Sequence, residues 1–133
     1  NAAGTGVLFS SLDFLVGATT RLLSSVGTTS SVTGIGFKPR AVILLGANAD
    51  STLGYGCIGL SSSSSANRAI EIDTGGNRVF SHNTLSVVLR GNAAGTSNQT
   101  GAISSFDNDG FSLSWAVNGT VAGTGNIYFL AMR

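Results

Sequence analysis

Charged side chains are scarce in this sequence. Only 10% of its 133 residues are Asp, Glu, Lys or Arg, and seven basic residues against six acidic ones leave a formal net charge of +1. A protein that neutralises a nucleic-acid backbone needs a surplus of basic groups, so we expect no nucleic-acid partner. Long apolar runs are also missing, because the longest strictly apolar run covers only residues 41–45, whereas a membrane helix needs roughly 20 residues. We therefore expect no membrane association.

Strong helix formers with long charged side chains are nearly absent. Lys, Glu and Pro occur once each, whereas Gly occurs 19 times and Ser and Thr are abundant. Gly and Ser favour turns, and β-branched Thr favours strands. Disorder is the usual alternative for a chain rich in Gly and Ser, but disordered chains combine low hydrophobicity with high net charge, and 42% of this sequence is hydrophobic. The composition predicts one folded, all-β unit of ordinary domain size.

Residues that commonly carry catalysis or bind metal ions are few. The sequence has one Cys, Cys57, and one His, His82, which lie far apart in the chain. We interpret Cys57 as a buried, inert thiol and His82 as a solvated loop residue between two strands. The scattered carboxylates do not have the spacing of zinc ligands. We therefore expect no enzymatic activity, no metal site and no cofactor.

Two short motifs have both a functional and a structural interpretation. Residues 54–59 match the Gly-x-Gly-x-x-Gly fingerprint of dinucleotide sites, but serines follow instead of a helix, so we interpret the glycines as points of close backbone approach or strong twist. Asp107 and Asp109 resemble the opening of a calcium loop, but the later Glu ligand is missing, and Asp-Gly before a strand is typical of a turn. We expect both motifs to serve the fold.

Apolar and small polar residues alternate with a period of two along much of the sequence, which is typical of half-buried β-strands. The continuous apolar run 41–45 instead suits a strand that is buried on both faces or held between a sheet and a neighbouring subunit. Strands are predicted at residues 7–16, 20–26, 41–45, 55–60, 69–73, 85–90, 101–106, 111–117 and 127–132, with loops at 61–65 and 91–100. This number of short strands predicts an antiparallel β-sandwich or jelly roll. The expected core residues are Phe37, Val42, Leu44, Phe111, Leu113, Trp115 and Phe129.

The chain divides into two parts by composition. Residues 1–32 are expected to form an N-terminal strand or an arm exchanged between subunits, and residues 33–133 to form the β-sandwich domain. Phe9, Leu12 and Phe14 lie among Gly and Thr residues in the first part. Terminal arms are exchanged between subunits at low cost, so these apolar residues are the candidate assembly contacts of the arm.

Three segments carry a resemblance to a known family. Residues 32–44 contain Gly-Phe-x-Pro-x-Ala-Val, residues 105–115 contain Asp-Gly-Phe-x-Leu-x-Trp, and residues 127–131 contain Tyr-x-Leu-Ala. This pattern resembles that of structural proteins in tailed-bacteriophage virions. Its spacing is also similar to that of H-type lectins, which are small antiparallel sandwiches that form trimers and bind sugars. The matching positions are mainly core and turn residues, so the resemblance bears more on fold than on role.

The resemblance implies a non-enzymatic virion structural protein. Its most direct form is a capsid decoration, or cement, protein that assembles as a homotrimer and contacts other virion proteins such as a major capsid protein. Few charges and an apolar surplus suit a subunit that buries its surface in an assembly. The alternative is a tail-fibre or receptor-binding module that binds carbohydrate as lectins do. Its candidate ligand contacts are Arg78, His82 and Asn83.

Overall fold

The structure, a computed structural model, describes residues 14–25, 28–48, 55–73, 78–91 and 96–133. These residues form ten β-strands and no helix, as the composition predicts. No described segment is therefore a helix long and apolar enough to cross a membrane. The strands are β1 (Phe14–Leu22), β2 (Thr29–Thr33), β3 (Ala41–Asn48), β4 (Tyr55–Ser61), β5 (Asn67–Asp73), β6 (Arg78–His82), β7 (Val87–Arg90), β8 (Asn98–Asp107), β9 (Gly110–Asn118) and β10 (Thr124–Met132).

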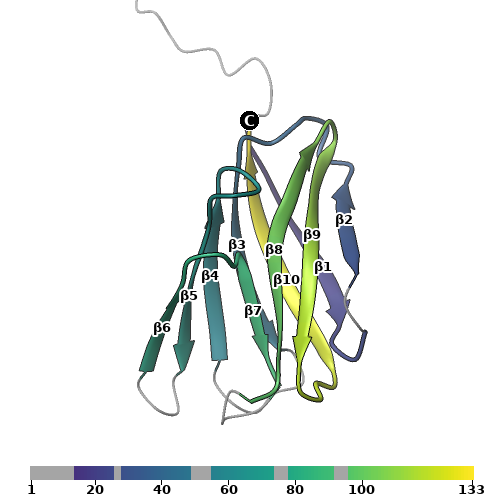
Figure 1. Ribbon diagram of the computed structural model, residues 1–133. Coiled ribbons are helices and arrows are strands. Elements are labelled where there is room, and N and C mark those ends of the chain that lie inside the picture. Colours follow the sequence, from purple (N-terminus) through teal and green to yellow (C-terminus); the bar gives the residue numbers. More distant parts are fainter. Residues whose placement is uncertain (1–13, 26–27, 49–54, 74–77, 92–95) are drawn as a thin grey trace, which may run out of the picture.

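The strands form two antiparallel sheets that pack against each other (Figure 1). The larger sheet has the order β1-β10-β3-β4-β5-β6, and the smaller one has the order β2-β9-β8-β7. The nested pairs β1·β10 and β2·β9 bring the two ends of the chain together, as in a jelly roll, whereas β3 to β6 and β7 to β9 follow one another as meanders. The predicted antiparallel β-sandwich is confirmed.

The core lies between the two sheets and follows from the period-two alternation. On β3 and β10 every second side chain points inward, where it meets the inward face of β9. The rings of Phe111 and Phe129, which come from opposite sheets, meet edge to face with their centroids 5.4 Å apart. All seven residues expected in the core are buried. A continuous apolar layer of this kind supplies most of the stability of such a domain.

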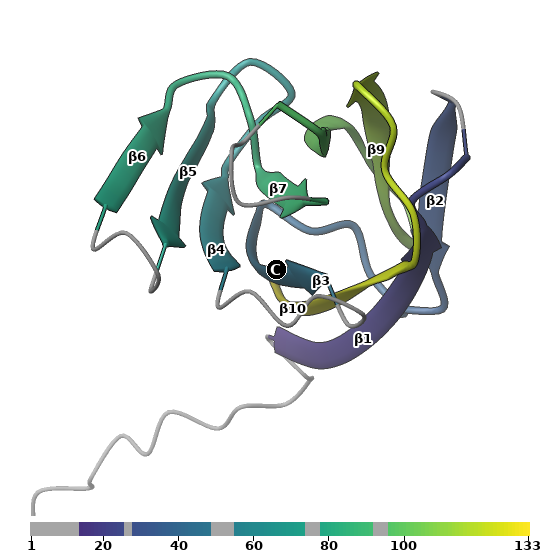
Figure 2. The ribbon, with the colours of Figure 1, turned by 90° about the horizontal axis from the view of Figure 1, so that it is seen from below.

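The two sheets differ in width, which leaves part of the larger one uncovered. Figure 2 shows β5 and β6 reaching past β7, the edge strand of the smaller sheet. The inner face of β6 therefore lies at the rim of the sandwich. His82 belongs to this strand, so its interpretation as a loop residue is wrong. Its side chain is only about a quarter exposed, at 27%.

Several strand boundaries differ from those predicted. The strand β1 continues through residues 17–19, where a break between the predicted strands 7–16 and 20–26 was expected, and residues 7–13 lie outside the described residues. The strand β8 begins at Asn98, inside the predicted loop 91–100. The pattern also missed β2 and β6. The sequence of β2, Thr-Ser-Ser-Val-Thr, has one apolar residue, and this edge strand is held by backbone pairing with β9 rather than by an apolar face of its own.

The N-terminal part of the chain is divided between described and undescribed residues. Phe14 opens β1, which pairs with β10 of the same chain along its whole length. The strand β2 likewise pairs with β9 within the chain. From Phe14 onward this region is therefore part of the sandwich. Phe9 and Leu12 lie outside the described residues.

Candidate assembly interface

The outer face of the six-stranded sheet carries an unusually large set of exposed apolar side chains. All ten large hydrophobic residues that the described chain leaves exposed belong to this sheet. They are Phe14, Val16, Leu22, Leu45, Ile58, Leu60, Ile70, Ile72, Val79 and Tyr128, with exposed fractions between 41% and 69%. We call the outward side of this sheet, on which these ten residues lie, the outer apolar face.

The strand register makes the outer apolar face continuous rather than scattered. Tyr128 on β10 lies opposite Leu45 on β3, which lies opposite Ile58 on β4, which lies opposite Ile70 on β5. Side chains directly opposite each other on one face have Cβ atoms about 5 Å apart. The four residues therefore form one apolar row across the middle of the sheet. A second row runs beside it through Leu130, Ile43 and Leu60.

The area of the outer apolar face is that of a protein interface. A large apolar residue offers about 150–200 Å² when fully exposed, so the ten fractions amount to roughly 900 Å². The largest apolar patch of an ordinary monomer is about 300–600 Å². One partner in a standard protein–protein interface contributes about 800 Å². This face has the dimensions of a surface that another protein covers.

The charge of the outer apolar face also favours burial. Among the described outward-facing strand positions of the six-stranded sheet, Arg68 is the single charged residue. Burying a charge without a partner is costly, whereas burying a nearly neutral sheet face avoids that cost. One feature of the sequence, the apolar run 41–45, already indicates this surface. In the apolar run 41–45, Val42 and Leu44 are buried in the core, while Leu45 remains 45% exposed on the outer side.

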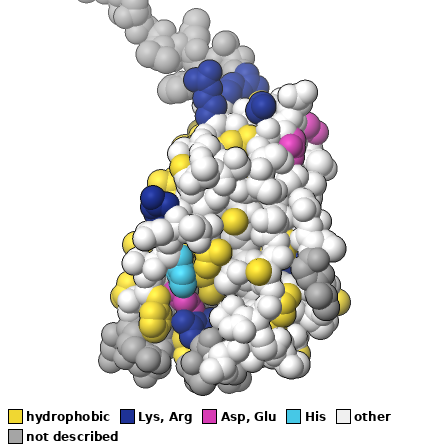
Figure 3. Space-filling view, in the orientation of Figure 1, with side chains coloured by type: hydrophobic (Ala, Val, Ile, Leu, Met, Phe, Trp, Pro, Cys, Tyr) yellow, Lys and Arg dark blue, Asp and Glu magenta, His cyan; other side chains and the backbone are white. Residues whose placement is uncertain are grey.

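Of the residues named as carbohydrate contacts, His82 belongs to a cluster of charged side chains. His82 Nε2 lies 3.3 Å from Oε2 of Glu71, a carboxylate that is 1% exposed and forms a two-point ion pair with Arg90. In Figure 3 the histidine lies directly beside the acidic and basic groups of this cluster. The backbone carbonyl of Asn83 accepts a hydrogen bond from Arg68. Arg78 belongs to β6, but its side chain lies outside what the structure describes.

Two aromatic rings flank the arginine of the Glu71 cluster. The Arg90 guanidinium lies 5.5 Å from the ring centroid of Tyr55 and 5.0 Å from that of Phe80. Burying a carboxylate is costly unless it is paired and hydrogen-bonded, and Arg90 supplies both a charged partner and two hydrogen bonds. The cluster thus ties β5 and β6 to β7 at the rim where the smaller sheet ends.

The two aspartates that resemble a calcium loop support a turn instead. Asp107 pairs with Gly110 across the β8–β9 hairpin, and its carboxylate accepts hydrogen bonds from two serine hydroxyls. The Asp109 carboxylate accepts hydrogen bonds from the backbone N–H groups of Gly34 and Gly36, at 3.0 and 2.6 Å. The turn interpretation is confirmed. Nowhere among the described residues do three or more His, Cys, Asp or Glu side chains gather as metal ligands do.

Gly59 of the glycine motif and Cys57 both lie at points of close packing. A Cβ atom on Gly59 would lie 1.6 Å from the carbonyl oxygen of Ser86, so this glycine lets the chain that leads into β7 approach β4. Cys57 is buried, and its Sγ accepts a hydrogen bond from the Val88 N–H group at 3.1 Å. Burial raises the pKa of the Cys57 thiol, which keeps it in the protonated, unreactive form.

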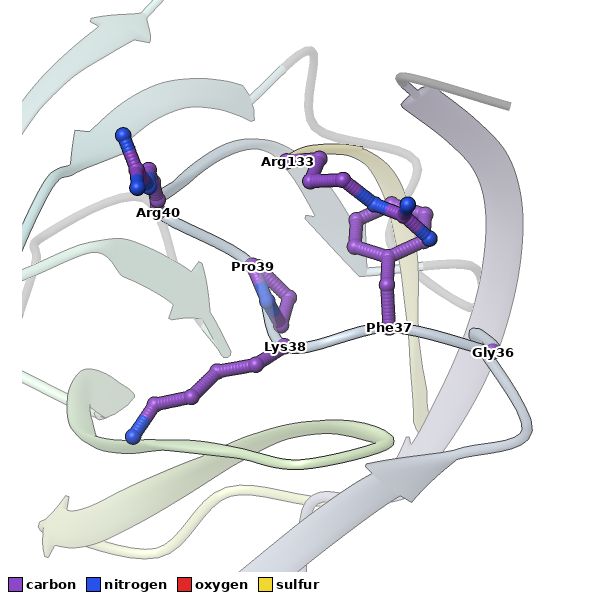
Figure 4. Close-up of a pocket in the computed structure, with 6 residues that line it drawn as sticks. All are labelled: Gly36, Phe37, Lys38, Pro39, Arg40 and Arg133. Carbon is purple, nitrogen blue, oxygen red and sulfur yellow. The ribbon is translucent and has the colours of Figure 1, made fainter. Parts of the chain in front are cut away.

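A second surface of distinct character lies at one end of the sandwich. An open hollow of about 490 Å³ is lined by the chain between β2 and β3 and by the end of β10 (Figure 4). Its lining residues are Gly36, Phe37, Lys38, Pro39, Arg40 and Arg133. Three of the seven basic residues of the chain are therefore gathered around it.

Comparisons of the chain with models of protein families, with curated proteins and with solved structures found no match.

Proposed function

We propose that this protein is a non-enzymatic structural subunit that buries its outer apolar face in an assembly with copies of itself. The observation that carries the proposal is the continuous, nearly uncharged row of apolar side chains across the six-stranded sheet. Exposed apolar area on this scale stabilises an assembly when it is covered, and it promotes aggregation when it is not.

The resemblance to virion structural proteins of tailed bacteriophages supports a more specific setting. In that setting the subunit is a capsid decoration protein, the assembly is a homotrimer, and a major capsid protein lies beneath it. A threefold arrangement would let the outer apolar faces of three copies meet around the axis, which suits a wide face with one charged residue. We propose this setting in preference to the lectin-like alternative, because His82 is engaged with Glu71 at the sandwich rim.

Sedimentation equilibrium of the full chain tests the self-association. We expect a species of about three times the 13.4 kDa mass of one chain at micromolar concentration. The double variant Ile58→Lys/Ile70→Glu places an ion pair at two positions that lie opposite each other in the centre of the face. The pair keeps a favourable cross-strand contact, so the variant should fold, yet it should sediment as a monomer.

A matched variant on the other sheet controls for the added charges. Ser114 and Ala102 lie opposite each other on the outward side of β9 and β8, so Ser114→Lys/Ala102→Glu introduces the same pair away from the outer apolar face. This control should remain a trimer. A wild-type chain that sediments as a monomer would overturn the proposal, and so would a face variant that associates as strongly as the control.

Immunogold labelling of virus particles from the source culture tests the virion setting. Antibodies raised against the purified protein should decorate the particle shell at regular positions. Label confined to the tail would contradict the decoration function and favour the receptor-binding alternative. A binding signal on a glycan array would support that alternative further. Particles without label would overturn the virion setting while leaving the self-association measurement as it stands.

A further inference from the structure

The basic end of the sandwich is a second candidate binding surface. Lys38, Arg40 and Arg133 surround the open hollow, and Figure 3 shows Lys and Arg side chains gathered at this end of the molecule. The chain has only seven basic residues, and three of them lie around this hollow, so its basic charge is unevenly distributed although the net charge is only +1.

The backbone that presents the basic side chains is firmly held. Side chains alternate between buried and exposed from Ile35 to Arg40, so Phe37 and Pro39 anchor the segment while Lys38 and Arg40 face solvent. The Arg40 N–H group donates to the carbonyl of Met132 at 2.8 Å, which joins the segment to the end of β10. A surface that is already ordered loses little conformational entropy when it binds.

Two glycines and an aspartate fix the other end of the same segment. Gly34 and Gly36 have φ angles of 82° and 81°, in the region that glycine adopts without strain. Both of their N–H groups donate to the Asp109 carboxylate, which thereby supports the loop on the β8–β9 turn. The negative charge of Asp109 is thus directed at backbone donors rather than at Lys38 or Arg40. Neither Lys38 nor Arg40 forms an ion pair with another residue that the structure describes.

The directions of the side chains indicate the shape of the ligand. In Figure 4 the Lys38 and Arg40 side chains point away from each other, and the Arg133 guanidinium lies over the Phe37 ring, 5.0 Å from its centroid. A single compact anion such as phosphate is bound by donors that converge on it. Cations that diverge around an open hollow suit several carboxylates spaced along a surface.

We infer that this basic end docks on an acidic protein surface, one that presents a row of Asp and Glu side chains. The inference gives the proposed subunit a second interface that differs from the first in chemistry. The outer apolar face joins like subunits, and the basic end attaches them to a different, acidic partner. Interfaces of this kind gain specificity and association rate from charge complementarity, and they weaken as salt screens the charges.

Binding of poly-L-glutamate to the full-length protein, followed by fluorescence anisotropy at 50 mM salt, tests the inference. We expect the wild-type chain to bind and Lys38→Gln and Arg40→Gln each to weaken binding about two- to fivefold, the range of an exposed ion pair. Raising the salt to 200 mM should weaken wild-type binding further and reduce the difference between the variants.

The control variant Ala116→Glu changes the net charge by the same amount at an exposed position of β9, far along the strand from the hollow. It should bind poly-L-glutamate nearly as the wild type does. Equal loss in this control would overturn the inference, because the effect would then follow net charge alone. Tighter binding of inorganic phosphate or of duplex DNA than of poly-L-glutamate would also overturn it, in favour of a compact anion or a nucleic acid. Sedimentation of the same variants keeps this test separate from the self-association, since Lys38→Gln and Arg40→Gln should leave the trimer intact.

Discussion

At the scale of single residues, the inward side chains of β9 illustrate how one strand serves the core. Trp115 is 8% exposed and shares its face with Phe111 and Leu113. Its indole N–H donates to the hydroxyl of Ser30 on β2 at 2.7 Å, and the Arg21 guanidinium lies 4.5 Å from its ring centroid. A buried indole needs such a partner for its N–H group, and here that partner comes from the edge strand. Trp115 therefore holds β2 as well as the core.

Replacing Trp115 by alanine should cost about 3–5 kcal/mol of unfolding free energy, because the substitution removes a large buried ring and leaves a cavity. That loss is a large share of the roughly 5–15 kcal/mol by which such a domain is stable. Urea unfolding followed by circular dichroism measures it. Trp115→Phe retains most of the buried ring and loses the bond to Ser30, so it should cost clearly less.

The chain contains a single tryptophan, so its fluorescence reports on Trp115 directly. Emission from the folded protein should be blue-shifted and poorly quenched by acrylamide. A red-shifted, readily quenched emission would contradict the core assignment. It would also favour a solvent-facing ring of the kind that stacks on sugars.

At the scale of strands, the period-two pattern predicts that a strand exists but does not by itself say which side of it faces inward. On β4 the inward positions are the small residues Cys57, Gly59 and Ser61, while the large residues Ile58 and Leu60 face outward. Alternation alone cannot assign the faces, because it reports the difference between neighbours and not the space available to them. The close approach of the chain before β7 demands small inward residues on β4, and that long-range contact is not encoded in local pattern.

The same reasoning explains which parts of the interface were visible in the sequence. The run 41–45 is apolar at every position, so it indicated a strand covered on both sides. The neighbouring strands β4 and β5 mix large apolar residues with small or polar ones, as half-buried strands do. Only the register, which sets Leu45, Ile58 and Ile70 in one row, shows that these residues form a common surface. The basic end likewise depends on the fold, since Arg133 is far from Lys38 in sequence.

The close packing at β4 makes Gly59→Ala a strongly destabilising substitution. The new methyl group would overlap the backbone of Ser86, which cannot rotate away as a side chain can. We expect a loss of about 3 kcal/mol or more in urea unfolding, at the upper end of the usual cost of overpacking. Gly56→Ala on the same strand is the matched control, because the nearest atom to its Cβ, the Gly46 carbonyl oxygen, is 3.9 Å away. Equal stability losses in the two variants would show that strand propensity, rather than contact with Ser86, determines the cost of replacing Gly59.

At the scale of the whole molecule, the structure separates two kinds of surface. The outer apolar face spreads across the six-stranded sheet, and the basic hollow occupies one end of the sandwich. The first depends on burial of apolar area, which salt screening does not weaken, and the second depends on charge, which it does. The two surfaces can therefore be distinguished by the salt dependence of what they bind.

The sequence offered a competing account of assembly, in which an exchanged N-terminal arm joins the subunits. Phe14 now belongs to a strand of its own chain, and Phe9 and Leu12 lie outside the described residues. A deletion that tests the arm should therefore stop at residue 13, because removing residues 14–18 as well would cut into β1 and its pairing with β10.

We expect the chain that lacks residues 1–13 to remain folded and to associate as the full chain does, because the described part of the outer apolar face begins at Phe14 and is retained. Its dissociation constant should change less than about twofold between 50 and 200 mM salt, since the face carries one charged residue, Arg68, and gains its free energy from apolar burial. Sedimentation velocity across a concentration series measures both quantities. A truncated chain that is folded but monomeric would show that the N-terminal arm, rather than the outer apolar face, joins the subunits. Dissociation of the full chain by moderate salt would instead require a charged contact between subunits, and the outer apolar face could not then be their principal interface.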